Sequence, residues 1–282
     1  MYSCLGSESE INKKDDCMLI YGIIFIFGFI MGSFLNVCIY RIPRGESIVS
    51  PAAHCPNCGT RLKPFDLLPH LSYLIHHGKC RYCDRKISPR YLFVELLTGI
   101  ASVTLFIKYG LTADFVAFLF LTFILIAVFF IDLDHQIIPN QLVITGLIGG
   151  AVLFVYNLFL PFQIYSDDLW WNPILGLVSG SGFLFGVSLI GLVIYKGDEV
   201  MGMGDVKLFA PIGLFLGWRM TLLALFLSVV LGGMLSLLLI LFGKATRKSR
   251  IPFGPFIVIG TFTTIMWGWQ LLHWYVNTYL YY

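Results

Sequence analysis

Long apolar runs recur along the chain, separated by short stretches that hold most of its polar and charged residues. A helix needs about 20 consecutive apolar residues to cross the hydrocarbon core of a bilayer. The runs predict membrane-spanning helices near residues 19–40, 91–108, 112–131, 141–160, 174–195, 206–218, 220–242 and 252–275. We therefore predict an all-α, polytopic membrane protein that crosses the bilayer about eight times.

Three of these runs need separate interpretation: the first has the position of a signal, the second contains Glu95, and the sixth is short. The run at 19–40 has the position of a secretory signal, but it is longer than the apolar region of about 7–15 residues in a signal peptide, and mixed charges precede it. We interpret it as a permanent span. The run at 206–218 is short, and its boundary with 220–242 depends on the tripeptide Gly217-Trp218-Arg219.

Composition agrees with this pattern. Hydrophobic residues make up 57% of the 282 positions, and the mean hydropathy is +0.82. Only 12% of the residues are charged, roughly half the share usual in soluble domains, which excludes an ordinary soluble globular protein. We expect an N-terminal tail at 1–18, a first helix at 19–40, an insertion at 41–90 and a transmembrane domain at 91–282.

Basic residues gather in two predicted loops and indicate the orientation, because Lys and Arg of short loops stay on the cytoplasmic side. Segment 41–90 has nine Lys and Arg residues and segment 243–251 has four, whereas 161–173 has none. With eight helices, both basic segments lie in the cytoplasm and both termini lie outside. Lys13 and Lys14 oppose this orientation, but nearby acidic residues offset them.

Two aspartates fall at the predicted cytoplasmic boundary, Asp132 in IDLDHQIIPN and Asp205 in KGDEVMGMGD. An ionisable group at the rim of a bilayer is costly and so indicates function. Two such carboxyl groups brought together would share a proton and could activate water, as in aspartic proteases. Helix caps or solvated boundary residues are the alternative on position alone. Gly202 and Gly204 favour the catalytic interpretation, because they let another chain approach closely.

Four of the seven cysteines form two pairs, Cys55-x-x-Cys58 and Cys80-x-x-Cys83, with 21 residues between the pairs. Two such turns can close a tetrahedron around zinc, and a site with four cysteines is structural because it has no open coordination position. A cytoplasmic location disfavours disulfides. Disulfides and free thiols remain the alternatives.

Other polar residues have two interpretations each. Glu95, inside the second span, is either a polar contact between helices or a contact to a cofactor or substrate. Lys207 either extends to the interface or biases the ionisation of the aspartates. From these residues alone, a proton-coupled transporter and a zinc-binding scaffold also remain open.

Six motifs give the chain a family resemblance. They are GSFLNVCIYRIPRGES at 32–47, HCPNCGTRL at 54–62, CRYCDRKISPRYLFVELLTG at 80–99, IDLDHQIIPN at 131–140, MGMGDVKL at 201–208 and IPFGPF at 251–256. Their order resembles that of the type IV prepilin leader peptidases, which are membrane aspartyl proteases with a G-x-G-D motif. The resemblance implies that Asp132 and Asp205 are catalytic and that 91–282 is the protease domain. Asp134 is the competing candidate in the first block, and the spacing to Pro139 in the family pattern favours Asp132.

The resemblance also implies the reaction. The substrates would be type IV prepilins or the pseudopilins of type II secretion, cut after the glycine that ends their basic leader. The four-cysteine insertion is similar to that of bifunctional members, which implies N-methylation of the new N-terminus with S-adenosylmethionine. We expect an enzyme of the bacterial inner membrane with its active site facing the cytoplasm. Contact with lipid is expected and binding of nucleic acid is not.

Overall fold

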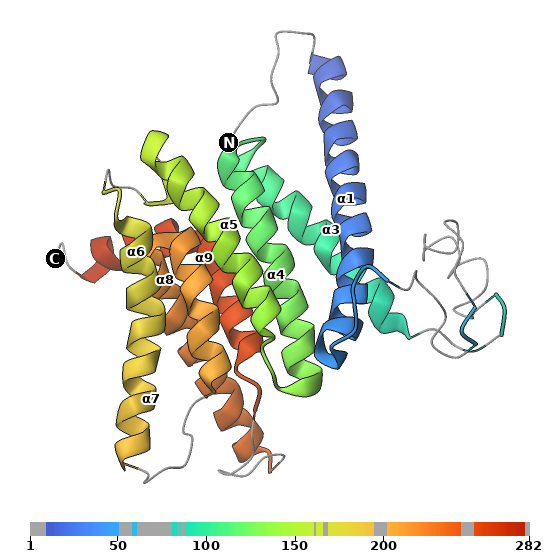
Figure 1. Cartoon of the computed structure of the whole chain (residues 1–282). Coiled ribbons are helices and arrows are strands. Elements are labelled where there is room, and N and C mark those ends of the chain that lie inside the picture. Colours follow the sequence, from blue (N-terminus) through green and yellow to red (C-terminus); the bar gives the residue numbers. More distant parts are fainter. Residues whose placement is uncertain are drawn as a thin grey trace. The chain divides into compact units, whose positions relative to one another are not determined.

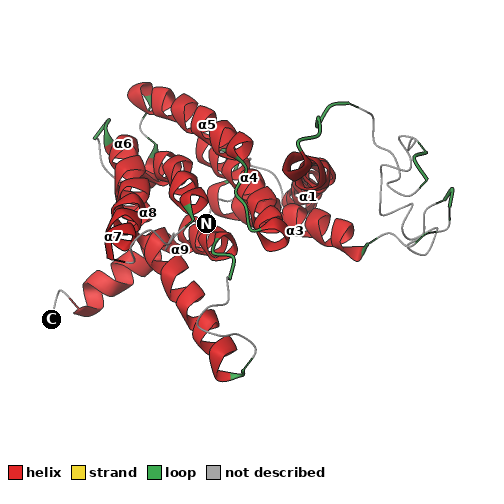
Figure 2. Cartoon of the chain, turned by 60° about the horizontal axis from the view of Figure 1, so that its bottom comes forward, coloured by secondary structure: helices red, strands yellow, loops and turns green. Residues whose placement is uncertain are grey.

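The computed structural model describes residues 10–50, 58–60, 81–83, 85, 88–160, 162–165, 169–194, 202–243 and 251–279. Every regular element in these ranges is helical, as predicted (Figure 2). The chain divides into two compact units, Met1–Leu111 and Thr112–Tyr282. Each unit has its own helix packing.

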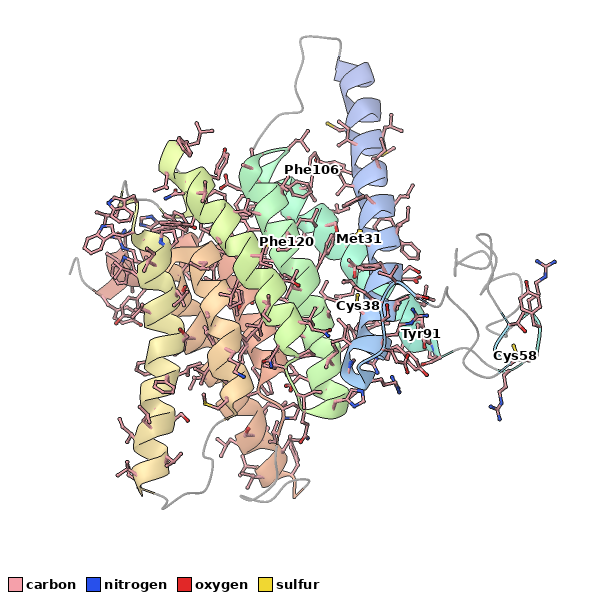
Figure 3. The ribbon with its side chains drawn as sticks, in the orientation of Figure 1. Met31, Cys38, Cys58, Tyr91, Phe106 and Phe120 are labelled. Atoms are coloured by element: carbon pink, nitrogen blue, oxygen red, sulfur yellow. The ribbon has the colours of Figure 1, made fainter. Side chains whose placement is uncertain are left out.

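The first unit is built on two helices that pack side by side, α1 (Glu10–Arg41) and α3 (Pro89–Tyr109) (Figure 1). A short 3-10 helix, η1 (Ile42–Arg44), follows α1. Met31 and Cys38 lie on α1, and Tyr91 and Phe106 lie on α3 (Figure 3).

Small residues allow α1 and α3 to approach closely. A Cβ atom at Gly32 would lie 2.7 Å from the Cα atom of Glu95, and one at Gly28 would clash with Ser102. Such small-residue contacts are a common way for membrane helices to associate. The side-chain amide of Asn36 adds a hydrogen bond across the pair, donating to the backbone oxygen of Tyr91 at 3.0 Å.

The second unit contains the remaining elements, which are coloured from green to red in Figure 1. They are α4 (Ala113–His135), α5 (Asn140–Phe159), the 3-10 helix η2 (Gln163–Tyr165), α6 (Asn172–Leu177), the π-helix η3 (Val178–Gly182), α7 (Phe183–Ile194), α8 (Met203–Leu241) and α9 (Gly254–Tyr279). Among the helices long and apolar enough to cross a membrane, α4 is the most deeply buried within the protein. Phe120 of α4 stacks on Phe215 of α8, with ring centroids 6.2 Å apart (Figure 3).

Seven helices of the described chain are long and apolar enough to cross a membrane, against about eight predicted. The difference lies in α8, which contains both the predicted sixth and seventh helices in one element of 39 residues. Such an element would be about 58 Å long if straight, nearly twice the hydrocarbon core of about 30 Å. α8 is not straight, because Gly217 within it has φ 70° and ψ 171°, far from helical values.

The neighbours of α8 show that the chain reverses direction at Gly217. A Cβ atom at Gly180 would lie 2.7 Å from the Thr221 side chain and 3.2 Å from that of Phe209. In a continuous helix these two residues would be about 18 Å apart along the axis. One glycine can meet both only if the segments on either side of Gly217 fold back on each other. α8 is therefore a helical hairpin.

Polar side chains hold the hairpin at its turn. The side-chain oxygen of Asn172 accepts a hydrogen bond from the N–H of Trp218 at 3.1 Å, and the Tyr165 hydroxyl donates to the backbone oxygen of Leu214 at 2.6 Å. Burial, and to a lesser extent the Asp114 carboxyl, raise the pKa of Tyr165 well above its usual range, so this hydroxyl stays protonated. The turn is thus held by one group from η2 and one from the start of α6.

Candidate active site

Asp132 lies in the last turn of α4 and is only 4% exposed. The helix ends at His135, where Gln136 takes a left-handed conformation and its N–H donates to the backbone oxygen of Asp132 at 2.9 Å. The carboxyl oxygen Oδ2 of Asp132 accepts a hydrogen bond from the N–H of Gly254 at 2.9 Å. A residue 122 positions away in the sequence therefore fixes this side chain.

Asp205 lies in the first turn of α8 and is half-buried. Gly202 precedes the helix in an extended conformation, and its backbone oxygen accepts a hydrogen bond from the N–H of Asp205 at 3.1 Å. The Asp205 carboxyl is close enough to that of Asp132 for the two to interact electrostatically. The structure thus brings together the two aspartates that the sequence singled out.

The two glycines before Asp205 face different surroundings. A Cβ atom at Gly204 would lie 3.2 Å from the Ile138 side chain, so glycine lets the start of α8 approach the segment that leads into α5. At Gly202 the only atom of the described residues within 4 Å of such a Cβ is Oδ2 of Asp205, at 3.3 Å. In the described part of the chain, Gly202 therefore leaves space beside the carboxyl group.

The remaining polar residues near the aspartates lie at the surface. Lys207 is exposed, and its Nζ donates to the Asn140 side-chain oxygen at 3.3 Å, which joins α8 to the start of α5. Asp134 and His135 are exposed, unlike Asp132. This difference in burial separates Asp132 from the competing candidate Asp134.

Glu95 belongs to the first unit and is 1% exposed. Hydrogen bonds join it to the side chains of Ser33 and Asn36 on α1. Its oxygen Oε2 is buried and has no hydrogen-bond partner. Glu95 is therefore at least a polar contact between α1 and α3.

The four cysteines of the predicted zinc site fall only partly within the described residues, because Cys55 and Cys80 lie outside them. Cys58 and Cys83 lie in two short described stretches, 58–60 and 81–83, and neither is joined in a disulfide. Gly59 has φ 67°, a conformation that suits a tight turn after a ligand. In the described part of the chain no three His, Cys, Asp or Glu residues form a metal-binding group. The two described thiols fit half of a four-thiolate set, and zinc stays a prediction.

Sequence reasoning missed one residue of this site, Gly254. The motif IPFGPF that contains it contributes to the family resemblance, but the pattern of the motif alone assigns no role to its glycine. The structure places its glycine against Asp132, where a Cβ atom would lie 2.6 Å from Oδ2.

Fold and site together define a class of protein. It is a helical protein with several apolar helices long enough to cross a membrane, in which a carboxyl group at the end of one helix interacts electrostatically with a carboxyl group at the start of another. Two protein families match the chain. Residues 26–109 match the family described as the Bacterial Peptidase A24 N-terminal domain, and residues 119–237 match the Type IV leader peptidase family.

Several relatives carry the name prepilin leader peptidase/N-methyltransferase. The relative from Aeromonas hydrophila is 32% identical over 93% of this chain and 96% of its own length. The relative from Bacillus subtilis is 34% identical over 90% of this chain and 97% of its own length. The relative from Pseudomonas aeruginosa is 31% identical over 89% of this chain and 92% of its own length. No solved structure shows significant similarity to the chain. The chain belongs to the type IV leader peptidase family, which confirms the resemblance inferred from its motifs and makes it a peptidase.

Proposed function

We propose that the chain is an aspartic endopeptidase that removes the basic leader from type IV prepilins or pseudopilins, cutting after a glycine at the cytoplasmic face of the membrane. Asp132 and Asp205 are its catalytic residues. The observation that carries this proposal is the proximity of their carboxyl groups at the ends of α4 and α8. If the two aspartates were only helix caps or solvated boundary residues, their carboxyl groups would have no reason to lie near each other.

Two neighbouring carboxyl groups do not ionise together easily, so one stays protonated while the other is charged. The charged group takes a proton from a water molecule as the water oxygen attacks the scissile carbonyl carbon. The protonated group donates a hydrogen bond to the carbonyl oxygen. When the tetrahedral intermediate collapses, the C–N bond breaks and the leaving amine takes a proton from the aspartate pair.

The surroundings of the pair suit an extended peptide. The open space at Gly202 gives a substrate backbone access to Asp205. Gly204 brings the start of α8 against Ile138, and Lys207 ties it to Asn140, so both residues hold this end of the helix in place. We assign Gly202, Gly204 and Lys207, at the start of α8, to the segment that receives the substrate.

We further propose that the enzyme methylates the new N-terminal amine, with S-adenosylmethionine as the methyl donor. The names of the relatives support this second activity. Glu95 is a candidate contact for the donor, because its Oε2 is buried without a hydrogen-bond partner. Its hydrogen bonds to Ser33 and Asn36 equally suit a structural role between α1 and α3.

Cys55, Cys58, Cys80 and Cys83 would hold a structural zinc ion. Four thiolates fill the tetrahedral coordination of zinc, so the ion would stabilise the insertion at 41–90 and leave no position for a reacting group. We place this insertion and the aspartate pair on the cytoplasmic side of the bacterial inner membrane. The domains would be a tail at 1–18, the helix at 19–40, the zinc insertion and the protease domain at 91–282.

The decisive experiment is the separate replacement of the two aspartates. Asp132→Asn and Asp205→Asn should each lower cleavage of a purified prepilin by on the order of 10³-fold, because each removes one half of the acid–base pair. Cleavage is measured by mass spectrometry of the released leader, with protein levels matched.

Asp134→Asn is the matched control, since it makes the same change on an exposed residue of the same helix turn. Its cleavage rate should stay within a few-fold of the unmodified enzyme. Full activity of Asp132→Asn or Asp205→Asn would contradict the proposed function.

A further inference from the structure

The amino end of α9 has one backbone donor that its own helix cannot use. The first N–H groups of any helix have no partner within the helix. In α9, Pro255 has no N–H, while the N–H groups of Phe256 and Ile257 both donate to the backbone oxygen of Phe253, at 3.0 and 3.2 Å. The N–H of Gly254 remains, and it donates to Oδ2 of Asp132 at 2.9 Å.

Only glycine fits at this position without displacing Asp132. A Cβ atom at residue 254 would lie 2.6 Å from Oδ2 and 2.9 Å from Cγ of Asp132. Residue 254 also precedes a proline, and a side chain there disfavours the helical conformation. Glycine therefore allows the helix to begin and the carboxyl group to reach its N–H.

The start of α9 is also held from another side. A Cβ atom at Gly232, in the second half of α8, would lie 3.3 Å from the rings of both Phe253 and Phe256. These rings flank Gly254 in the sequence, so Gly232 seats the segment that contains the donor. The same α8 hairpin thus carries Asp205 in its first half and supports the partner of Asp132 with its second half.

We propose that Gly254 is a positioning residue of the peptidase. Its N–H holds Oδ2 of Asp132 and leaves Oδ1 as the oxygen that works with Asp205 and the attacking water. The partial positive charge at the start of α9 also favours the charged form of the Asp132 carboxyl. This inference rests on the proposed function, and it makes the amino end of α9 a third component of the catalytic site.

Gly254→Ala tests the inference directly. The added methyl group must displace the Asp132 carboxyl, and a displacement of about 1 Å can cost on the order of 10²-fold in rate. We expect kcat for prepilin cleavage to fall by about 10- to 100-fold, with KM changed by less than about two-fold. Gly232→Ala presses only on Phe253 and Phe256, so its kcat should fall by a few-fold.

A pH profile of kcat separates positioning from loss of folded protein. A smaller folded fraction lowers the whole profile uniformly, whereas a displaced Asp132 loses the donor that stabilises its charged form and moves the acidic limb to higher pH. Among the described residues, the other charged or titratable groups near the aspartates in the sequence are Asp134 and His135 of α4 and Asp205 and Lys207 of α8, and all stay unchanged in the variants. Residues 251–256 contain none.

Gly233→Ala is the matched control. It adds the same methyl group to the residue next to Gly232, where no atom of the described residues lies within 4 Å of the added group. Its kcat and pH profile should equal those of the unmodified enzyme. A folded Gly254→Ala variant with the kcat and profile of this control would overturn the inference.

If Gly254→Ala does not fold, Gly232→Ala becomes the test of the inference. An unchanged kcat and an unchanged pH profile of kcat in Gly232→Ala would then count against the positioning of Asp132 by Gly254. Failure of the proposed function is distinguishable, because it would appear as retained cleavage in Asp132→Asn and Asp205→Asn.

Discussion

Asp132 and Asp134 are two residues apart, and a helix turns by about 200° over that distance. They therefore point to nearly opposite sides of α4, and the structure buries Asp132 and exposes Asp134. The hydrophobic pattern alone cannot choose between them, because both lie at the end of the apolar run. Resemblance to the family pattern favoured Asp132, and its burial and its contact with Gly254 agree with that choice.

The role of Gly254 could not be predicted from the sequence. Its hydrogen bond to Asp132 joins positions 122 residues apart, and no local spacing indicates such a pair. The sequence does contain one usable signal: in Phe253-Gly254-Pro255 the proline lacks a donor and the glycine lacks a side chain. A helix that begins there must leave the glycine N–H for a partner outside the helix.

The cysteines allow a prediction at the same scale. The proposed four-cysteine site would bind about one zinc ion per chain. Cys58→Ser should then reduce bound zinc to a small fraction of that amount, because three thiolates and a hydroxyl bind zinc less well than four thiolates. Bound metal is measured by elemental analysis after removal of loosely bound ions. Cys38→Ser is the control, since Cys38 is buried in α1 and belongs to neither pair. Full retention of zinc in Cys58→Ser would argue against the metal site.

At the scale of elements, the helices were largely predictable because each apolar run is long and bounded by polar residues. The predicted run at 174–195 corresponds to α6, η3 and α7, which together form one candidate span, Asn172–Ile194. The predicted boundary at Gly217-Trp218-Arg219 coincides with the break in α8. The pattern could not say whether the chain bends or reverses there, because the turn depends on Asn172 and Tyr165 from a distant segment.

Gly217 should therefore be a strong determinant of stability. Gly217→Ala places a Cβ atom at a position with φ 70°, against Asn172 and 2.9 Å from a ring carbon of Tyr165. A left-handed non-glycine residue costs about 1–3 kcal/mol, and the clash adds to this cost. Thermal unfolding in detergent should show a clearly lower midpoint for Gly217→Ala.

Gly233→Ala serves as the comparison within the same element. Its Cβ meets no atom of the described part of the chain within 4 Å, and alanine is a better helix former than glycine by about 1 kcal/mol. Its midpoint should stay equal or rise. Equal midpoints for the two variants would mean that the turn at Gly217 is not a rigid part of the fold.

At the scale of the whole molecule, each of the two family matches, at 26–109 and 119–237, lies within one compact unit, and α9 of the second unit lies beyond the second match. Both aspartates belong to the second unit, whereas Glu95 and the cysteine pairs belong to the first. The sequence could locate the insertion at 41–90 by its many basic residues and its two Cys-x-x-Cys pairs. It could not predict that α3 packs with α1, because both helices are apolar runs without a pairing signal.

The hairpin in α8 makes a prediction about how the second unit crosses the membrane. A straight α8 would put residues 202 and 243 on opposite sides of the bilayer, whereas a reversal at Gly217 puts both on the side of the aspartate pair. The four basic residues of 243–251 favour the cytoplasm for that side, and segment 161–173, which has no basic residue, is favoured on the outer side of the membrane.

Alkaline phosphatase is active only when it is exported, so fusions of this enzyme report the side of the membrane on which each position lies. Fusion after Trp170 should give high activity, and fusions after Gly202 and Gly243 should both give low activity. High activity at only one of the latter two positions would contradict the hairpin, and high activity at both with low activity at Trp170 would invert the proposed orientation.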